Sequence, residues 1–268
     1  MDKRIIGLGL IAGLTGGVAA FGTARWNVTP AIANAIQYEE GRSAAEAALT
    51  GEHEHGHELF SRALQENVGA GVATIAFGIV IGALFAVAFA MVWAALRRRG
   101  AATARGTAMA LSAAGFVAVC LVPFLVYPAS PPGVGDHDTM AARTTAYLTV
   151  LLLSVGLAVA AFVLASRLVA AIGAFYAALA GVGGYLVAVG VVAALSPSYV
   201  ETPGPLTDGR GTMVFPGFPA DVLADFRIYS VLSQLALWLV IGVVFAALIP
   251  RVLAGHAAPT DRVATLAV

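Results

Sequence analysis

Charged residues are scarce in this chain. Asp, Glu, Lys and Arg together make up 11% of its 268 residues, whereas a soluble domain carries roughly a quarter. Hydrophobic residues account for 59% and the mean hydropathy is +0.87. So few charges cannot cover a water-facing surface, and the sequence therefore predicts an integral membrane protein embedded in the lipid bilayer. The formal net charge is zero and there is no stripe of basic residues, so nucleic-acid binding is not expected.

Cysteine and the common catalytic motifs are also nearly absent. Cys120, in an apolar run, is the single cysteine of the chain, which excludes an internal disulfide and a zinc site built from several cysteines. The sequence contains no Walker motif, no Gly-x-Ser-x-Gly and no His-Glu-x-x-His. We therefore expect a chain that does not use ATP itself and is not an enzyme. No permanently bound cofactor is expected.

Ionisable residues are missing from the middle of every long apolar run. Because such residues usually mark proton relays and ion sites in membranes, their absence argues against a haem with histidine ligands in the membrane and against a carboxylate-based proton antiporter. The polar residues that remain are mild, and helix packing is the simplest role for them: Thr74, Ser112, Cys120, Tyr147, Ser154, Tyr176, Tyr185, Ser233 and Gln234.

Six apolar runs reach the length of about 20 residues that a membrane span requires. They predict an all-α fold, a polytopic bundle of six transmembrane helices in a single integral membrane domain over residues 1–268. The predicted spans are 5–23, 68–96, 106–127, 144–166, 169–195 and 229–249, with only Ser166, Arg167 and Leu168 between the fourth and fifth. The first run also fits a signal peptide, because Lys3 and Arg4 precede it and small residues end it.

The distribution of charge predicts an orientation. With the N-terminus in the cytoplasm, the cytoplasmic segments hold nine basic and two acidic residues, and the outer loops hold six arginines and thirteen acidic residues. The positive-inside rule therefore favours cytoplasmic N- and C-termini in the inner (plasma) membrane of a bacterium. The inverted orientation would place Arg97–Arg99 outside.

Three outer loops follow from this topology, over residues 24–67, 128–143 and 196–228. The first is acidic and is predicted to be partly helical, over Ala31–Glu40 and Ala44–Leu49. The third is rich in Pro and Gly. It ends in Asp221–Arg227, which we expect to form a short amphipathic helix at the interface, with Asp221 as its N-cap.

The densest group of potential metal ligands lies in the first loop. Three imidazoles and three carboxylates occur within seven residues: Glu52, His53, Glu54, His55, His57 and Glu58. Imidazole suits Co, Ni, Zn and Cu as divalent ions, and carboxylates add negative charge. The sequence indicates contact with a divalent transition metal without selecting one. The alternative is a solvated acidic linker in which the histidines have no fixed role.

The second loop is a proline-rich hairpin between the third and fourth spans. Pro128, Pro131 and Pro132 prevent either helix from continuing through it. Asp136, His137 and Asp138 are candidates for meeting a cation. The alternative is helix capping by Asp138 or Thr139, with Arg143 paired to one of these aspartates.

Glycines spaced by four mark two of the predicted spans. Gly9, Gly13 and Gly17 lie on one face of the first, and Gly78 and Gly82 lie on one face of the second. Such faces let two helix backbones approach closely. We assign these five residues to helix packing.

Several stretches together resemble the CbtA family, the proposed cobalt transporter subunit of bacteria. The most specific is Pro123–Asp136, with its Tyr-Pro-x-x-Pro-Pro-x-Val-Gly pattern. The others are Gly7–Ala20, Pro30–Glu40, Ser61–Gly69 and Phe77–Gly82. The family often carries a lysine before the tyrosine of the hairpin, where this chain has Val126. The resemblance implies a cobalt transporter subunit with a small, His-bearing, single-span partner, CbtB.

Two functional hypotheses follow. In the first, the chain is the membrane subunit of a transition-metal uptake transporter, with cobalt(II) or a similar divalent ion as cargo and the outer His and acidic residues capturing it. In the second, it is a non-transporting membrane protein that binds metal or assists assembly. The lack of charged residues inside the spans favours the second.

Overall fold

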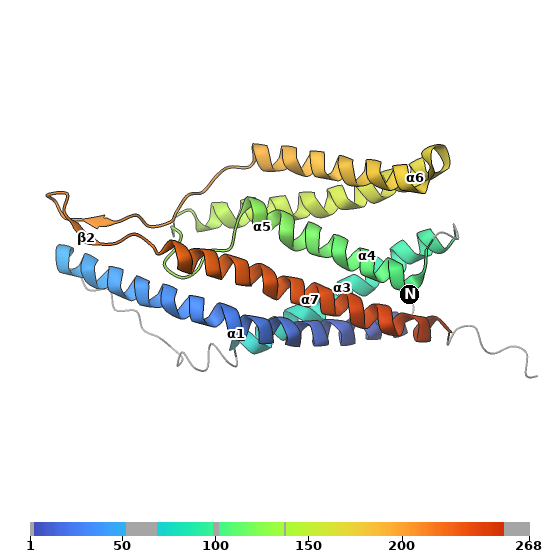
Figure 1. Ribbon diagram of the computed structural model, residues 1–268, viewed down its shortest axis with the longest axis horizontal. Helices are drawn as coiled ribbons and strands as arrows, with labels where there is room; N and C mark the ends of the chain where they lie inside the picture. Colours follow the sequence, from blue (N-terminus) through green and yellow to red (C-terminus); the bar gives the residue numbers. More distant parts are fainter. Residues whose placement is uncertain (1–2, 52–68, 99–101, 137, 255–268) are drawn as a thin grey trace, which may run out of the picture. The chain divides into compact units, whose positions relative to one another are not determined.

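A computed structural model describes residues 3–51, 69–98, 102–136 and 138–254 (Figure 1). The long helices are α1 (Lys3–Thr50), α3 (Ala70–Arg97), α6 (Met140–Leu195) and α7 (Ala220–Ala254). A shorter helical run passes from α4 (Ala104–Gly115) through a π-helix, η2 (Phe116–Leu121), into α5 (Val122–Val126). Strands β1 (Leu206–Thr207) and β2 (Met213–Phe215) pair antiparallel.

Five helical stretches in the described part of the chain are long and apolar enough to cross a membrane: α1, α3, the run from Ala104 to Val126, α6 and α7. Ala, Leu, Val and Ile dominate them, and in a bilayer a helix satisfies all of its backbone hydrogen bonds internally. The predicted all-α class with several apolar helices is therefore confirmed.

Helix α6 reverses its direction at Gly173, where φ is 78° and ψ is 163°. The Tyr185 hydroxyl lies 2.8 Å from Oγ of Ser154, although a straight helix would separate residues this far apart in sequence by about 46 Å. The helix is therefore a hairpin of two arms, residues 140–172 and 174–195, and Figure 1 shows the second arm running back along the first.

The sequence prediction placed this reversal at Ser166–Leu168, and these residues instead lie inside the first arm. The backbone conformation at residue 173 is essentially accessible only to glycine. The turn therefore occurs at a glycine, Gly173, which lies seven residues after Ser166, the first residue of the predicted break.

Two other predicted boundaries are wrong. Residues 24–50 continue α1 as one helix rather than forming a loop with two short helices. Pro30 lies inside it and removes a single backbone donor, while the surrounding alanines favour helix. At about 1.5 Å per residue α1 is about 72 Å long, more than twice the hydrocarbon thickness of about 30 Å. Likewise, Asp221–Arg227 is the first part of α7, and Asp221 lies in its first turn.

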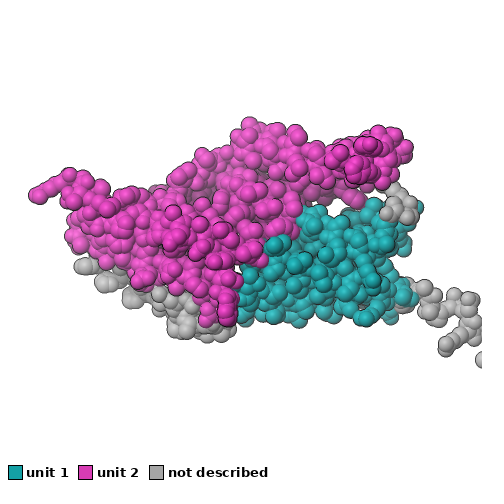
Figure 2. Space-filling view, viewed as in Figure 1, with its two compact units in different colours: residues 1–23, 60–115, 233–268 teal, residues 24–59, 116–232 magenta. Residues whose placement is uncertain are grey.

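The chain divides into two compact units (Figure 2). Unit 1 comprises residues 1–23, 60–115 and 233–268, and unit 2 comprises residues 24–59 and 116–232. Long helices pass from one unit into the other, so the two are described separately below.

Glycines hold unit 1 together. A Cβ built on Gly78 would lie 2.6 Å from the carbonyl oxygen of Gly13 and 2.7 Å from Cα of Gly17. The same holds for Gly82 and Gly9, whose backbones meet directly. The N-terminal part of α1 therefore crosses α3 backbone to backbone, and the five glycines singled out in the sequence all lie at this crossing.

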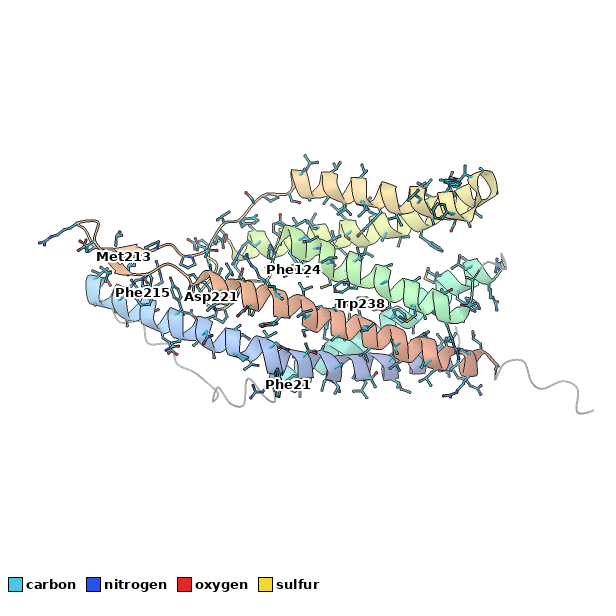
Figure 3. All side chains as sticks on the ribbon, viewed as in Figure 1. Phe21, Phe124, Met213, Phe215, Asp221 and Trp238 are labelled. Carbon is cyan, nitrogen blue, oxygen red and sulfur yellow. The ribbon has the colours of Figure 1, made fainter. Side chains whose placement is uncertain are left out.

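Side chains of α7 complete unit 1. Phe245 contacts the rings of Phe85 and Phe89 at centroid distances of 5.0 and 4.8 Å. The Ser112 hydroxyl donates to the carbonyl oxygen of Trp238, the α7 residue labelled in Figure 3. The buried Ser233 hydroxyl donates to the Ala20 carbonyl at 3.0 Å. Each polar side chain buried here is thus paired with a backbone carbonyl.

The centre of unit 2 contains a backbone irregularity with a clear sequence cause. In a π-helix each carbonyl pairs with the N–H five residues later, and the residue five positions after Ala118 is Pro123, which has no N–H. The Ala118 carbonyl instead accepts a hydrogen bond from Ser154 Oγ at 2.8 Å. Ser154 is 1% exposed, and it links η2 to both arms of α6 through Tyr185.

Candidate functional site

The residues with the strongest predicted metal chemistry lie outside the described part of the chain. They are Glu52, His53, Glu54, His55, His57, Glu58 and His137. Asp136 and Asp138 are described, and both are exposed at the start of α6. Among residues 3–51, 69–98, 102–136 and 138–254, no three His, Cys, Asp or Glu side chains gather closely enough to hold a metal ion.

The proline-rich hairpin folds as a rigid loop between α5 and α6. Pro131 is fully buried, and its carbonyl accepts the backbone N–H of Val134 at 3.2 Å. Gly133 and Gly135 have φ of 73° and 124°, values that favour glycine. A side chain at Gly135 would also collide with the Arg143 guanidinium. Proline and glycine together therefore fix the path of the loop that presents Asp136 and Asp138.

Glu201 joins this loop to the segment that follows α6. One of its carboxylate oxygens lies 3.0 Å from Nη1 of Arg143 and accepts the backbone N–H of Asp136 at 2.8 Å. The other accepts the Thr139 hydroxyl. The Glu201 carbonyl also accepts the N–H of Gly135, at 3.3 Å. One residue thereby fixes the hairpin and the first turn of α6.

These contacts keep Glu201 ionised. The hydrogen bond from Thr139, the backbone N–H of Asp136 and the charge of Arg143 hold the pKa of this carboxyl below its usual range, against the opposing effects of desolvation and of the neighbouring Asp136. With several donors already on its oxygens, Glu201 acts as a positioning residue for the loop.

The structure changes the predicted partners of Arg143. Its ion pair is with Glu201, not with Asp136 or Asp138, and its Nη2 reaches only the backbone carbonyl of Asp136, at 3.4 Å. The pairing was missed because Glu201 is distant in sequence. One signal was available: Glu201 is the single acidic residue between Ser196 and Thr207.

Capping of α6 also differs from the prediction. Thr139 is the N-cap residue, but its side chain makes no capping hydrogen bond and instead contacts Glu201 and the carbonyl of Asp136. Asp136 Oδ1 accepts the backbone N–H of Asp138 at 2.9 Å. Asp136 and Asp138 are both exposed, so a cation can reach both carboxylates from solvent.

A second group of contacts attaches the β1–β2 segment to the C-terminal half of α1. The Tyr38 ring meets Phe215 and Phe218 at centroid distances of 5.4 and 4.8 Å, and its hydroxyl donates to the carbonyl of Pro216. Arg42 donates to the carbonyl of Gly204 at 2.8 Å. Figure 3 shows Phe215 beside the end of α1. Sequence reasoning gave none of these residues a role.

A comparison with protein families identifies the family to which the chain belongs. The family model described as "Probable cobalt transporter subunit (CbtA)" matches residues 2–250. The chain belongs to the CbtA family. The match covers both units and the hairpin with its Tyr-Pro-x-x-Pro-Pro pattern, so the resemblance predicted from the sequence is confirmed. No curated protein and no solved structure matches the chain.

Membership of the CbtA family fits a multi-pass membrane protein concerned with cobalt transport. The word "subunit" in the family description implies that a CbtA chain acts with a partner. A transport function agrees with a chain whose described part contains five helical stretches long and apolar enough to cross a membrane.

Proposed function

We propose that this CbtA chain is the membrane subunit of an uptake transporter for Co²⁺ or a similar divalent transition-metal ion. The single observation that carries the proposal is the family match over residues 2–250. The apolar helices supply the membrane-embedded body. The carboxylates of Asp136 and Asp138, held in place by the Glu201 contacts, supply negative charge at one loop.

The proposed membrane topology has six spans with both termini in the cytoplasm of a bacterium. The reversal at Gly173 supports it, because each arm of α6 exceeds the roughly 20 residues that a span needs. An even number of spans places both termini on one side, and the arginines at 97–99 favour the cytoplasm for that side. A reporter fused after Arg99 should read cytoplasmic, and an outside reading would reject the topology.

In this topology the residues from Glu52 to Glu58, together with Asp136, His137 and Asp138, face the outside and capture the cation. Three imidazoles and several carboxylates raise the local concentration of a divalent transition metal. The implied partner is a small His-bearing, single-span subunit of the CbtB kind.

Cellular uptake of ⁵⁷Co tests the proposal. Cells should be compared with and without the chain, each with and without the small partner. We expect uptake that depends on the chain, and a lower rate at limiting cobalt when His53, His55 and His57 are all replaced by alanine. Arg62→Ala, in the same loop, serves as a control that leaves the imidazoles intact. Equal uptake in all four cell types would reject transport.

A second candidate is a membrane protein that binds metal or assists assembly without transporting. The absence of any three-residue ligand group among the described residues favours it. Cobalt bound by purified protein in a histidine-dependent way, with no uptake in any cell type, would support this candidate over the first.

A further inference from the structure

An open groove of about 660 Å³ runs between the two arms of α6 in unit 2. Tyr127 and Tyr199, whose ring centroids are 6.0 Å apart, lie at one end. None of its lining residues is charged. The wall is mostly apolar, but hydroxyl groups interrupt it.

Five side-chain hydroxyls lie in the wall, and those of Tyr127, Thr145, Thr149 and Ser196 give their protons to the backbone; the fifth belongs to Tyr199. Thr145, Thr149 and Ser196 each donate to the carbonyl oxygen four residues earlier, at 2.9, 2.8 and 2.8 Å. Tyr127 donates to the carbonyl of Pro197 at 2.8 Å. Because a hydroxyl has one proton and two lone pairs, each of these oxygens is left as a hydrogen-bond acceptor.

Hydroxyl groups whose protons are already used continue beyond the groove. Val150 and Val192 line it, and Ser154 and Tyr185 follow them on the same helix faces, one turn and two turns away. Ser154 gives its proton to the Ala118 carbonyl, so the bond between Ser154 and Tyr185 must use the proton of Tyr185. The Tyr185 oxygen is then also left as an acceptor.

A wall in which most hydroxyl oxygens are left as acceptors suits a hydrated cation. The waters around a cation point their hydrogens outward, whereas an anion requires donors. Six waters at about 30 Å³ each occupy roughly 180 Å³, which the groove accommodates. With no charged group in the wall, the ion would be held weakly enough to leave again, as conduction requires.

We propose that the groove between the arms of α6 admits the divalent cation with its water shell, and that the Ser154–Tyr185 pair forms its inner end. This inference rests on the proposed transport function and adds a path to it. It places the path along hydroxyl and carbonyl oxygens of unit 2, and this path requires no buried carboxylate.

Thiol labelling tests whether the groove holds water. In a Cys120→Ala background, Leu153→Cys lies in the groove wall, and Leu152→Cys, at a position that is 71% exposed and outside the wall, is its matched control. A cationic, membrane-impermeant methanethiosulfonate should label Leu153→Cys several times faster than Leu152→Cys. Co²⁺ should slow that reaction, and an anionic reagent should react more slowly. Equal, slow labelling at both positions would overturn the proposal.

Uptake of ⁵⁷Co then tests the acceptors. Thr149→Val and Tyr185→Phe should each lower uptake by about fivefold, the effect of one lost hydrogen bond. Thr144→Val and Tyr176→Phe are exposed and outside the groove wall, so they should leave uptake unchanged at equal protein levels. Unchanged uptake in Thr149→Val and Tyr185→Phe would also overturn the proposal.

The two readouts separate the failure of this path from the failure of transport. Normal uptake by the unmodified chain combined with an unlabelled groove rejects the path alone. A groove that is labelled and protected by cobalt, in a chain that gives no uptake with or without the partner, rejects transport but supports a cation site in the groove. If the groove is not labelled and the chain gives no uptake, both the path and the transport function are rejected.

Discussion

Replacement of Gly82 by alanine should force α1 and α3 apart in unit 1. The new Cβ would lie 2.6 Å from Cα of Gly13 and 2.7 Å from its backbone nitrogen, and backbone atoms cannot rotate away. Ordinary contacts of a Cβ begin at 3.4 Å and the Gly9 carbonyl oxygen lies closer still, so the helices would have to separate by at least about 0.8 Å. A gap of this size forfeits a quarter to a half of the dispersion energy of each facing atom pair.

The expected cost of this overpacking is about 1–3 kcal/mol. Alanine also has a higher helix propensity than glycine, by up to ~1 kcal/mol, and this gain must be removed from the comparison. Gly7→Ala does so, because Gly7 lies on α1 with no atom within 4 Å of a built Cβ. The difference between the two variants therefore isolates the helix crossing.

The assay is reversible unfolding in mixed micelles of mild detergent and dodecyl sulfate, followed by circular dichroism. Gly82→Ala should unfold at a lower dodecyl sulfate fraction than Gly7→Ala, and Gly7→Ala should match or exceed the unmodified chain. If Gly82→Ala were as stable as Gly7→Ala, the helices would not cross backbone to backbone at this point.

Three further predictions concern unit 2. Ser154→Ala leaves the buried Ala118 carbonyl without a donor and should lower the free energy of unfolding by about 1–3 kcal/mol. Gly173→Ala places a side chain at a backbone conformation that essentially only glycine adopts, and this variant should by itself lower the free energy of unfolding by ~1–3 kcal/mol. The same micelle titration measures both. The folded pKa of Glu201 lies below its unfolded value, so its stabilising effect is complete above the unfolded pKa of about 4.3 and is lost as pH falls through the folded pKa. Glu201→Gln should remove that loss from the pH profile of stability.

For each of these predictions, a control defines the result that would contradict it. Ser230→Ala removes a hydroxyl that donates to its own helix and should cost less than Ser154→Ala; equal costs would contradict the special role of Ser154. Gly156→Ala, with open space around it, should be harmless in contrast to Gly173→Ala. A Glu201→Gln variant with the same acid sensitivity as the unmodified chain would show that Glu201 does not contribute to it.

Hydropathy predicted the apolar helices well because burial in lipid is a property of composition over about 20 residues. The second predicted span, 68–96, agrees with α3 at Ala70–Arg97. The ends of α1 and α7 were not predictable in the same way. Residues 24–50 and 220–228 are too polar to be read as membrane spans, yet they keep the helical conformation of the apolar segments that they extend.

Contacts between distant segments explain what the sequence could not reveal. Arg143 was expected to pair with an acid nearby in sequence, but the fold brings Glu201 to it from the far end of α6. Nor does a hydropathy profile show which glycine carries a positive φ. Gly173 and Gly181 look alike in sequence, but Gly173 makes the turn and Gly181 packs against Ala161 and Ala165.

A neutral, acceptor-lined path has a consequence for metal selectivity. Hydroxyl and carbonyl oxygens contact only the water shell of a hydrated ion, and that shell differs little between Mg²⁺ and Co²⁺. Imidazole does discriminate, because it suits Co²⁺ and Ni²⁺ while Mg²⁺ prefers oxygen and retains its waters. On the proposed function, we therefore expect the preference for a transition metal to arise before the groove, at His53, His55 and His57. The groove wall would then set how fast a captured ion passes.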